Sequence, residues 1–518
     1  MDIIVRESTF GRLLNHLTKG RVFPYPLHSI STVSLTSSSP GFTSEKGDGP
    51  YKLIGWTGSD DPEKPMNWST GAKFMVMLGV MILNFSFYAA AAIFTPSIPG
   101  IEEDFQVGAA DGTLGLSLFV IAYGIGPLIL SPLSNIPSIG RTPVYILGLL
   151  CFFVLQIGTA VAKNIQTVLI LRSLAGLFGS APISVGGATL SEIYGPSHMP
   201  YAIAFYAVSG VCGPILGPII GTGAILQWHT WRASMWVLAG MSAFALVWMI
   251  FFLPETLYDN ILLRRAQRIR KRTRDETIRS EGEVKMCALS ISRTVANQIV
   301  ADFRMSFADP IILFVNLHTM LIYGVLYLWF EFFPFVFADI YGFTPLQQAL
   351  AFFGIFIGAV ISVIVYLLWL RFSYEPSAAK LGASYKPEVR LIPGQIGAAC
   401  IPICLFIFSW TSRDNIHWIA PIIGTAFFAP GFYLTFQSAL NYLGESYPRH
   451  VASVFAGNTF FRSSFGGALP LAAPAMLSSL GLGWASSILG FISVAMLPLP
   501  FILARYGEKL RAWSSYAN

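Results

Sequence analysis

The chain is built around long apolar segments, most of which contain no charged residue. Residues 235–253 and 482–504, for example, contain no Asp, Glu, Lys or Arg. A helix of about 20 such residues crosses the hydrocarbon core of a bilayer. Only 12% of the chain is charged, against roughly 25% in soluble domains. The sequence therefore predicts a polytopic membrane protein.

Twelve segments have the length and polarity of membrane-spanning helices, six on each side of a charged central stretch. We predict an all-α membrane protein with two six-helix halves. The expected spans are approximately residues 74–97, 113–133, 143–162, 166–187, 200–223, 233–253, 310–333, 347–370, 391–410, 416–438, 451–474 and 482–504.

Polar segments divide the chain into five parts. The first is polar, with a Ser/Thr-rich tract at 29–39 and scattered charges, which predicts a largely disordered cytoplasmic tail. The parts are an N-terminal tail at 1–71, a first half at 72–253, a central loop at 254–309, a second half at 310–506 and a C-terminal tail at 507–518.

Basic residues are distributed unequally between the loops. The 254–309 loop contains eleven Lys and Arg residues, whereas the 98–112 loop is acidic and contains none. Because positive charge collects on the cytoplasmic side of short loops, both termini are predicted to be cytoplasmic. The basic run at 262–274 predicts an amphipathic helix on the inner leaflet, where each base contributes ~1 kcal/mol near anionic lipid. The positive charge thus reflects topology, and no nucleic acid is expected as a partner.

Several short motifs lie in the first half. Asp61 to Trp68 read D-P-x-x-P-x-N-W before the first span, and the tryptophan favours an anchor at the membrane interface. Span 5 has glycines and prolines at helical spacing, which flatten one face and bend the helix: Gly210, Gly213, Pro214, Gly217, Pro218 and Gly221. The loop between spans 2 and 3 combines Gly126, Pro127, Asn135, Gly140 and Arg141.

These motifs resemble those of the major facilitator superfamily, specifically its fungal twelve-span drug:proton antiporters. The resemblance covers about residues 52–510 and is nearest to the branch of cercosporin-facilitator and benomyl/caffeine-resistance transporters. It implies that the loop motif latches the two halves through an acidic residue and a Gly-Arg pair. Asn135 stands at the acidic position here, so Arg141 is expected to lack its nearest candidate carboxylate. The span-5 motif is characteristic of exporters and implies close helix packing.

Arg172 is predicted to lie inside the hydrocarbon region. At ~1.5 Å per residue it is ~9 Å from the outer end of span 4. A cation at this depth is costly and indicates a function, and the resemblance implicates it in proton coupling. The alternative is a structural arginine that snorkels outward or bonds backbone carbonyls.

Polar residues within other spans are further candidates for the substrate cavity or for proton coupling. Arg462 lies near mid-membrane in span 11, where the cost of a charge indicates either a role or a buried partner. His318 is a candidate proton carrier, although a histidine hydrogen-bonded between helices is commoner. Glu331 lies near the outer end of its helix, where solvation is the simplest interpretation. The remaining candidates are Asn84, Tyr88, Asn316, Tyr323, Gln437 and Asn441.

We expect proton-coupled export of a small amphipathic organic compound by alternating access, across the plasma membrane. The compound is expected to be a secondary metabolite or toxin, and antifungal drugs are candidates too. The expected partners are this substrate, protons and membrane lipids. We expect a monomer with no enzymatic activity, cofactor or metal. The alternatives are an importer or facilitator of a nutrient such as a polyamine or vitamin, and a non-transporting membrane sensor.

Overall fold

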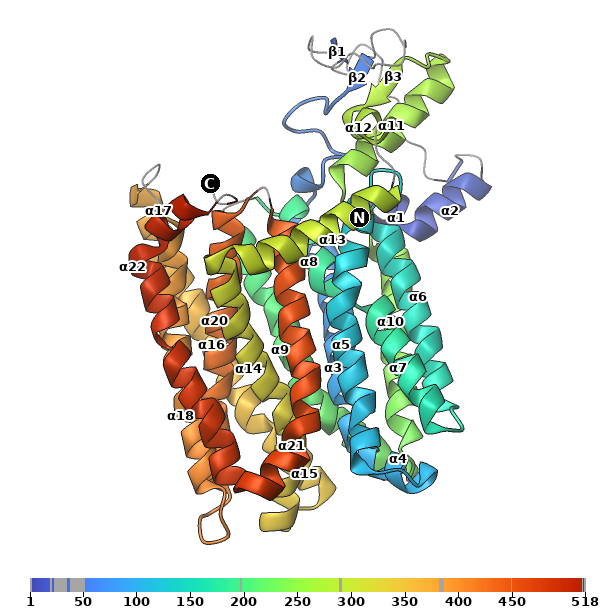
Figure 1. Ribbon diagram of the computed structural model, residues 1–518. Coiled ribbons are helices and arrows are strands. Elements are labelled where there is room, and N and C mark those ends of the chain that lie inside the picture. Colours follow the sequence, from blue (N-terminus) through green and yellow to red (C-terminus); the bar gives the residue numbers. More distant parts are fainter. Residues whose placement is uncertain are drawn as a thin grey trace.

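The computed structural model describes residues 2–18, 21–22, 35–37, 52–195, 198–287, 291–381, 386–448, 450–514 and 516. Its main body is a bundle of long helices (Figure 1). The first half of the chain forms the right side of the bundle in that view, and the second half forms the left side. This division confirms the predicted all-α membrane fold.

The first half contains six passes through the bundle. Ser69 caps the first helix by accepting a hydrogen bond from the Ala72 amide, and the fourth pass breaks at Ser180, just before Pro182. The helices are α3 (Thr70–Ala92), α5 (Ala109–Ser134), α6 (Arg141–Ala160), α7 (Ile165–Gly179) with α8 (Ala181–Ile193), α9 (Met199–Trp228) and α10 (Arg232–Phe252). The short helices η3 (Thr95–Ser97) and α4 (Ile98–Phe105) join α3 to α5.

The second half repeats this pattern with more interruptions. Its segments are α14 (Pro310–Pro334), η4 (Phe335–Ile340), α15 (Pro345–Ala351), α16 (Phe353–Trp369), η5 (Leu370–Tyr374), α17 (Glu375–Leu381), η7 (Pro387–Leu391), α18 (Ile392–Thr411), α19 (Ile419–Ala426), α20 (Phe428–Ser446), α21 (Val451–Met496) and α22 (Pro498–Trp513).

The count of passes agrees with the sequence prediction. Eleven helical segments of the described chain are long and apolar enough to cross a membrane. The last of them contains two passes, because the chain reverses at Gly481, where φ is 70°. Only glycine adopts this left-handed region without strain. Twelve passes result, with ends within several residues of those expected.

Both termini lie at one end of the bundle, which we call the terminal face; the other end is the opposite face (Figure 1). The terminal face carries α1 (Asp2–Glu7), α2 (Thr9–Leu17), α11 (Tyr258–Thr273), α12 (Glu281–Cys287) and α13 (Ile291–Ala308). Strand β2 (Lys52–Ile54) pairs antiparallel with β1 (Leu35–Ser37) and parallel with β3 (Ile278–Ser280). Helix α13 contacts α5 of the first half and α21 of the second.

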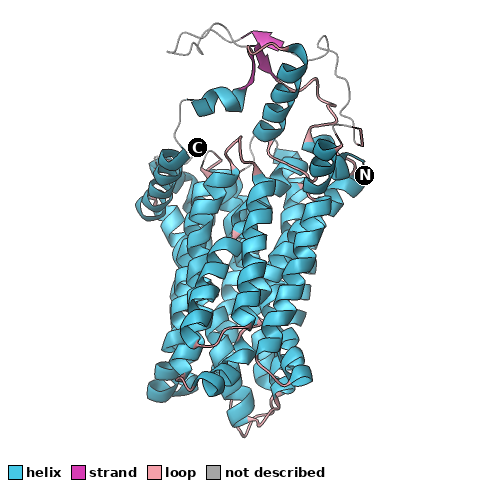
Figure 2. Cartoon of the chain, turned by 90° about the vertical axis from the view of Figure 1, so that its right-hand side faces the viewer, coloured by secondary structure: helices cyan, strands magenta, loops and turns pink. Residues whose placement is uncertain are grey.

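The terminal face shows two features that are not expected from the sequence. Residues 2–17 form helices and residues 52–68 pack on α11, so these parts of the 1–71 tail are ordered; most of the Ser/Thr-rich tract lies outside the described residues. The basic run is helical, and α11 projects from the terminal face of the bundle toward the small sheet (Figure 1 and Figure 2). Four arginines of this helix form ion pairs with carboxylates of the protein: Arg264, Arg265, Arg268 and Arg270.

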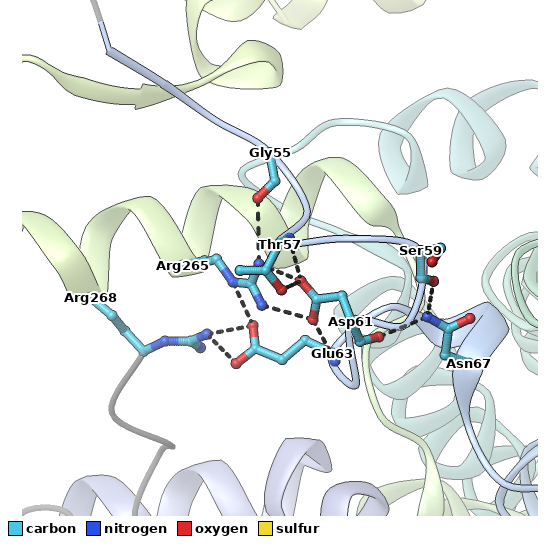
Figure 3. A network of polar contacts seen from close by, with 8 residues as sticks. All are labelled: Gly55, Thr57, Ser59, Asp61, Glu63, Asn67, Arg265 and Arg268. Atoms are coloured by element: carbon cyan, nitrogen blue, oxygen red, sulfur yellow. Dashed lines mark hydrogen bonds and ion pairs between the residues drawn. The ribbon is translucent and has the colours of Figure 1, made fainter. Parts of the chain in front are cut away.

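The motif before the first span forms a buried polar network with α11 (Figure 3). Asp61 receives two hydrogen bonds from Arg265, at 2.7 and 3.0 Å, and Glu63 binds both Arg265 and Arg268. Burial raises the pKa of Asp61, but the hydrogen bonds from Arg265 and from the Thr57 amide outweigh it and hold the pKa well below its usual range. The motif therefore fastens the N-terminal segment to the central loop, beyond the interfacial anchor expected from its tryptophan.

Candidate substrate and coupling site

Tyrosine hydroxyls join the two halves in the middle of the bundle. Tyr123 of α5 forms hydrogen bonds with Tyr323 and with Tyr327 of α14, the latter at 3.0 Å. Arg462 of α21 donates to the hydroxyl of Tyr88 on α3, at 3.1 Å. All five side chains are buried. We call these five residues the central cluster.

Arg462 has an aromatic environment. Its guanidinium carbon lies 4.9 Å from the ring centre of Tyr323 and 5.4 Å from that of Phe436. Phe432 stacks on Phe436 at 4.5 Å. Cation–π contacts of this kind strengthen when water is excluded. The Nε of Arg462 has no hydrogen-bond partner among the described residues, so the cluster offers aromatic surface and a free donor together.

The first half holds its side of the cluster through Asn84. The Asn84 amide donates to Ser209 at 2.9 Å, and its oxygen accepts from Tyr206 at 3.1 Å, which joins α3 to α9. Both contacts stay within the first half. Asn84 lies one helical turn from Tyr88, but its hydrogen bonds hold α3 against α9 within the first half. Tyr88, in contrast, contacts Arg462 of the second half.

Arg172 is fully buried and is also held within the first half. Its Nε donates to the carbonyl of Gly115 at 3.1 Å, and a terminal nitrogen donates to that of Ala90 at 3.0 Å. The rings of Phe94 and Phe119 cover the guanidinium at 4.1 and 4.5 Å. The arginine thus ties α3, α5 and α7 together through backbone carbonyls, which was the structural alternative.

The polar residues of the second half fall into different places. Asn316 accepts a hydrogen bond from Asn458 at 3.0 Å inside that half, and His318 borders a small pocket between α14, α18, α20 and α22. Asn441 donates to the carbonyl of Gln437 in its own helix, at 2.6 Å. The Gln437 amide reaches the first half at the carbonyl of Ile203, at 3.4 Å. The structure therefore brings Tyr88, Tyr323, Arg462 and Gln437 to the contact between halves, and keeps Asn316 and His318 away from it.

Sequence reasoning missed several residues of this contact. Tyr123, Tyr327, Phe432 and Phe436 lie in aromatic-rich apolar runs, where each reads as ordinary core. Tyr433 also crosses the contact and donates to the Ala204 carbonyl at 3.0 Å. The one available signal was that Tyr323 and Tyr327 are spaced to share a helix face.

The loop motif is assembled within the first half. Arg141 binds Glu192 of α8 with two nitrogens, at 2.9 and 2.8 Å, and its amide donates to Glu255 at 3.0 Å. Arg141 lacks the nearest candidate carboxylate, at position 135, but α8 supplies another one 51 residues away. Asn135 is exposed at the end of α5. Burial raises the pKa of Glu255, although amide hydrogen bonds from Leu257 and Arg141 lower it.

The glycines of the loop motif explain how closely these elements approach. Gly140 has φ 81°, and a Cβ there would lie 2.4 Å from the Glu255 carboxylate. A Cβ on Gly126 would lie 2.5 Å from the Leu177 carbonyl, so α5 and α7 touch there; Pro127 follows inside α5. Both glycines allow contacts that any other residue would block.

The span-5 glycines press α9 against α3. A Cβ on Gly213 would lie 2.7 Å from the Tyr88 Cβ, and one on Gly217 would lie 2.8 Å from the Ala92 Cβ. At Gly221 it would lie 2.7 Å from the Ile93 carbonyl, and at Gly210 it would lie 3.3 Å from Asn84. Pro214 and Pro218 lie inside the same helix. These contacts are the expected close packing, between two helices of one half and directly behind Tyr88.

The halves also touch at both ends. On the terminal face, the Tyr201 hydroxyl donates to Glu375 at 2.8 Å. On the opposite face, Thr113 donates to Glu331 at 3.2 Å. Glu331 is partly buried in this contact, so the expectation that it is simply solvated is wrong.

Known proteins are similar to this chain in sequence and in fold. Residues 80–470 match the sequence profile of the Major Facilitator Superfamily. "Transporter mfs1" of Schizosaccharomyces pombe is 40% identical, over 99% of this chain and 99% of that protein. "Cycloheximide resistance protein" of Candida maltosa is 38% identical over 90% of this chain and 86% of its own length. "Fluconazole resistance protein 1" of Saccharomyces cerevisiae is 36% identical over 95% of this chain and 90% of its own length.

Among solved structures, the xylose transporter XylE from E. coli in a partially occluded inward-open conformation has a TM-score of 0.58. It is 14% identical and covers 84% of this chain and 98% of its own, which shows a common fold. The twelve passes, the contact between halves and these relatives lead to one conclusion: the chain is a multi-pass membrane transporter of the Major Facilitator Superfamily, in its fungal drug:proton antiporter family, and not an enzyme.

Proposed function

We propose that this protein exports small amphipathic organic compounds in exchange for protons, by alternating access between its halves. The central cluster is the observation that carries the proposal. It joins the halves through hydroxyl groups and one arginine within aromatic walls. Ligand sites are usually apolar with few polar groups that set orientation, and this composition suits secondary metabolites, toxins and antifungal drugs.

The cluster also has the position that alternating access requires. A substrate that enters between the halves separates Tyr88 from Arg462 and Tyr123 from Tyr327, and it takes over their hydrogen bonds. Arg462, Tyr88 and Tyr323 are the residues that we assign to substrate contact, with Gln437 at the rim. Asn84, Asn316, Asn441 and Arg172 support the walls, because their contacts stay within one half. His318 is left without an assigned role in substrate contact.

Relatives and charge support the direction of transport. Two relatives are named for resistance to fluconazole and to cycloheximide, which favours export over import of a nutrient. The basic central loop favours a cytoplasmic terminal face, and we propose that the protein acts as a monomer in the plasma membrane.

Uptake into everted plasma-membrane vesicles tests this proposal. The interior of such a vesicle corresponds to the cell exterior, so an acid interior should drive uptake of radiolabelled fluconazole or cycloheximide, and a protonophore should abolish it. Equal uptake with and without the pH gradient would indicate a facilitator. No uptake of either compound would reject these drugs as substrates, and a sensor would transport neither.

Arg462→Ala and Tyr506→Phe make a matched pair for this assay. Arg462 belongs to the central cluster, whereas Tyr506 is 47% exposed on α22. We expect the first variant to lose gradient-driven uptake and the second to keep it.

A further inference from the structure

A carboxylate lies in the contact that closes the opposite face. Glu331 is near the end of α14, and its Oε1 accepts the hydrogen bond from Thr113 in the first turns of α5. The two residues are 218 positions apart and belong to different halves. Any movement that opens the opposite face between α5 and α14 breaks this hydrogen bond and wets the carboxylate.

A second carboxylate faces the first. Glu102 of α4 packs against the neighbouring residue of α5, since a Cβ on Gly112 would lie 2.9 Å from its Oε1. It is also close enough to Glu331 for their charges to interact. The first turn of α5 therefore lies between two carboxylates, one from each half.

The remaining charged groups that the structure describes near this contact form no ion pair with Glu331. Arg172 donates to the carbonyl of Gly115, two residues from Thr113, and Arg232 pairs with Asp104 of α4 at 2.6 Å. Asp111 and Asp339 are exposed, and α15 and residues 463–484 of α21 contain no titratable residue. In the adjoining 412–418 loop, the guanidinium of Arg413 lies over the ring of Trp410, at 5.1 Å. The backbone of Arg413 and the charge of Asp414 interact with the hydroxyl of Tyr341. The ring of His417 contacts that of Trp418. No base among the described residues forms an ion pair with Glu331.

This arrangement makes the closed contact sensitive to protons. An ionised carboxylate that loses water without gaining a cation is unfavourable, and a like charge beside it adds repulsion. A protonated Glu331 keeps the hydrogen bond from Thr113 through its carbonyl oxygen and removes the repulsion. Closure of the opposite face thus favours the protonated form, and opening favours the ionised form.

We propose that Glu331 is a proton-binding site whose protonation from the water at the opposite face closes that face. This inference rests on the proposed proton-coupled export and names the group that senses the proton there. After substrate leaves on that side, proton uptake by Glu331 would return the transporter to the state that opens at the terminal face.

Distance measurements between spin labels test the proposal on the full chain. The five native cysteines are replaced by serine, and labels are attached through Ala110→Cys on α5 and Leu346→Cys on α15, both exposed positions. The protein is measured in lipid nanodiscs from pH 5 to 8. One proton taken up on closure changes the ratio of closed to open molecules by at most about tenfold per pH unit.

We expect three carboxylate variants to behave differently. Glu331→Gln should stay closed at every pH, because it mimics the protonated form. Glu102→Gln should keep the pH response but move it to lower pH, because the repulsion is gone. Glu103→Gln should match the unmodified chain, because Glu103 is exposed on the same helix as Glu102. Glu331→Asp keeps a carboxylic acid and should retain a pH response. This variant replaces Glu331→Gln as the test if the glutamine variant folds poorly.

The outcomes separate this inference from the proposed function. A Glu331→Gln variant that opens and closes with pH as the unmodified chain does would overturn the inference, as would an unmodified chain without pH response. Gradient-driven vesicle uptake that survives Glu331→Gln would also overturn it while leaving proton-coupled export intact. A pH response that depends on Glu331, together with uptake that ignores the pH gradient, would support the site and reject the coupling.

Discussion

Arg172 and Arg462, both buried deep within membrane-spanning helices, have partners of different kinds. Arg172 donates only to carbonyls of its own half and is covered by two phenylalanine rings of that half. Arg462 donates to Tyr88 of the other half, and each arginine keeps one nitrogen without a partner among the described residues. Both charges are costly at this depth. We propose that the half that supplies the partners, not the depth of the charge, distinguishes a fixed support from a contact that transport must break.

Removal of Arg172 should have the largest effect on stability. Arg172→Ala removes two hydrogen bonds to carbonyls and leaves a cavity between α3, α5 and α7, so we expect a loss of ~2–5 kcal/mol and no transport. Arg172→Lys should recover little, because a single ammonium does not reproduce the planar guanidinium. Thermal unfolding of purified protein in detergent measures the stability. Native stability with lost transport would instead place Arg172 among the moving contacts, as proton coupling requires.

Removal of Arg462 should act mainly on transport. Arg462→Ala breaks the hydrogen bond to Tyr88 and the aromatic contacts in the central cluster, so we expect vesicle uptake to fall by about 30-fold, or ~2 kcal/mol. The same preparation should lose clearly less thermal stability than Arg172→Ala does. If the two variants lose stability equally, the distinction between fixed and moving arginines is wrong.

The close packing of the α9 glycines on α3 tests whether the first half is one fixed unit. Gly217→Ala places a methyl group 2.8 Å from the Ala92 Cβ, and such overpacking should cost ~1–2 kcal/mol. Gly223, on the same helix, has no atom within 4 Å of an added Cβ. Gly223→Ala should therefore stabilise the helix by ~0.5–1 kcal/mol. Thermal unfolding that gives both variants the same sign would contradict the packing of α9 on α3.

Asp302 gives the contact between α13 and α21 on the terminal face a pH dependence. It is buried on α13, and burial raises its pKa to about 6 although hydrogen bonds from Ser453 and Gln298 lower it. The folded state therefore binds this proton more tightly than the unfolded state. Its contribution to the free energy of unfolding is complete below pH ~4 and is lost as pH rises to ~6. This loss amounts to about 1 kcal/mol or more. Unfolding of Asp302→Asn should lack this slope; an unchanged slope would assign it elsewhere.

The loop motif should show the smallest effect. Asn135 is exposed, and Arg141 already binds Glu192 with two nitrogens. Asn135→Asp adds at most an exposed ion pair, which contributes about 0–1 kcal/mol, so the label distances across the opposite face should not change. Glu192→Gln removes the real partner and is the matched test. A clear shift with Asn135→Asp alone would restore the latch that the family resemblance implies.

The sequence predicts the membrane-spanning helices better than it predicts which side chains contact one another. Long apolar runs mark membrane helices directly, so the twelve passes and their approximate ends follow from composition. The partners depend on how helices pack: Glu192 meets Arg141 only because α8 lies beside α6, and Tyr123 meets Tyr327 only across the halves. The spacing of Arg172 along its helix shows its depth, but the carbonyls of Gly115 and Ala90 carry no sequence signal, since every residue has one.

The network around Asp61 has a consequence for how the protein is made. Asp61 precedes the first pass, whereas Arg265, 204 residues later, follows the sixth. At about 5–20 residues per second, a ribosome needs roughly 10–40 s to reach that arginine. During this interval six helices can enter the membrane while two carboxylates wait at its surface for their cations. The first half is thus complete only when α11 has been synthesised, and a nascent chain cut off at Phe252 would expose the charges that the finished protein hides.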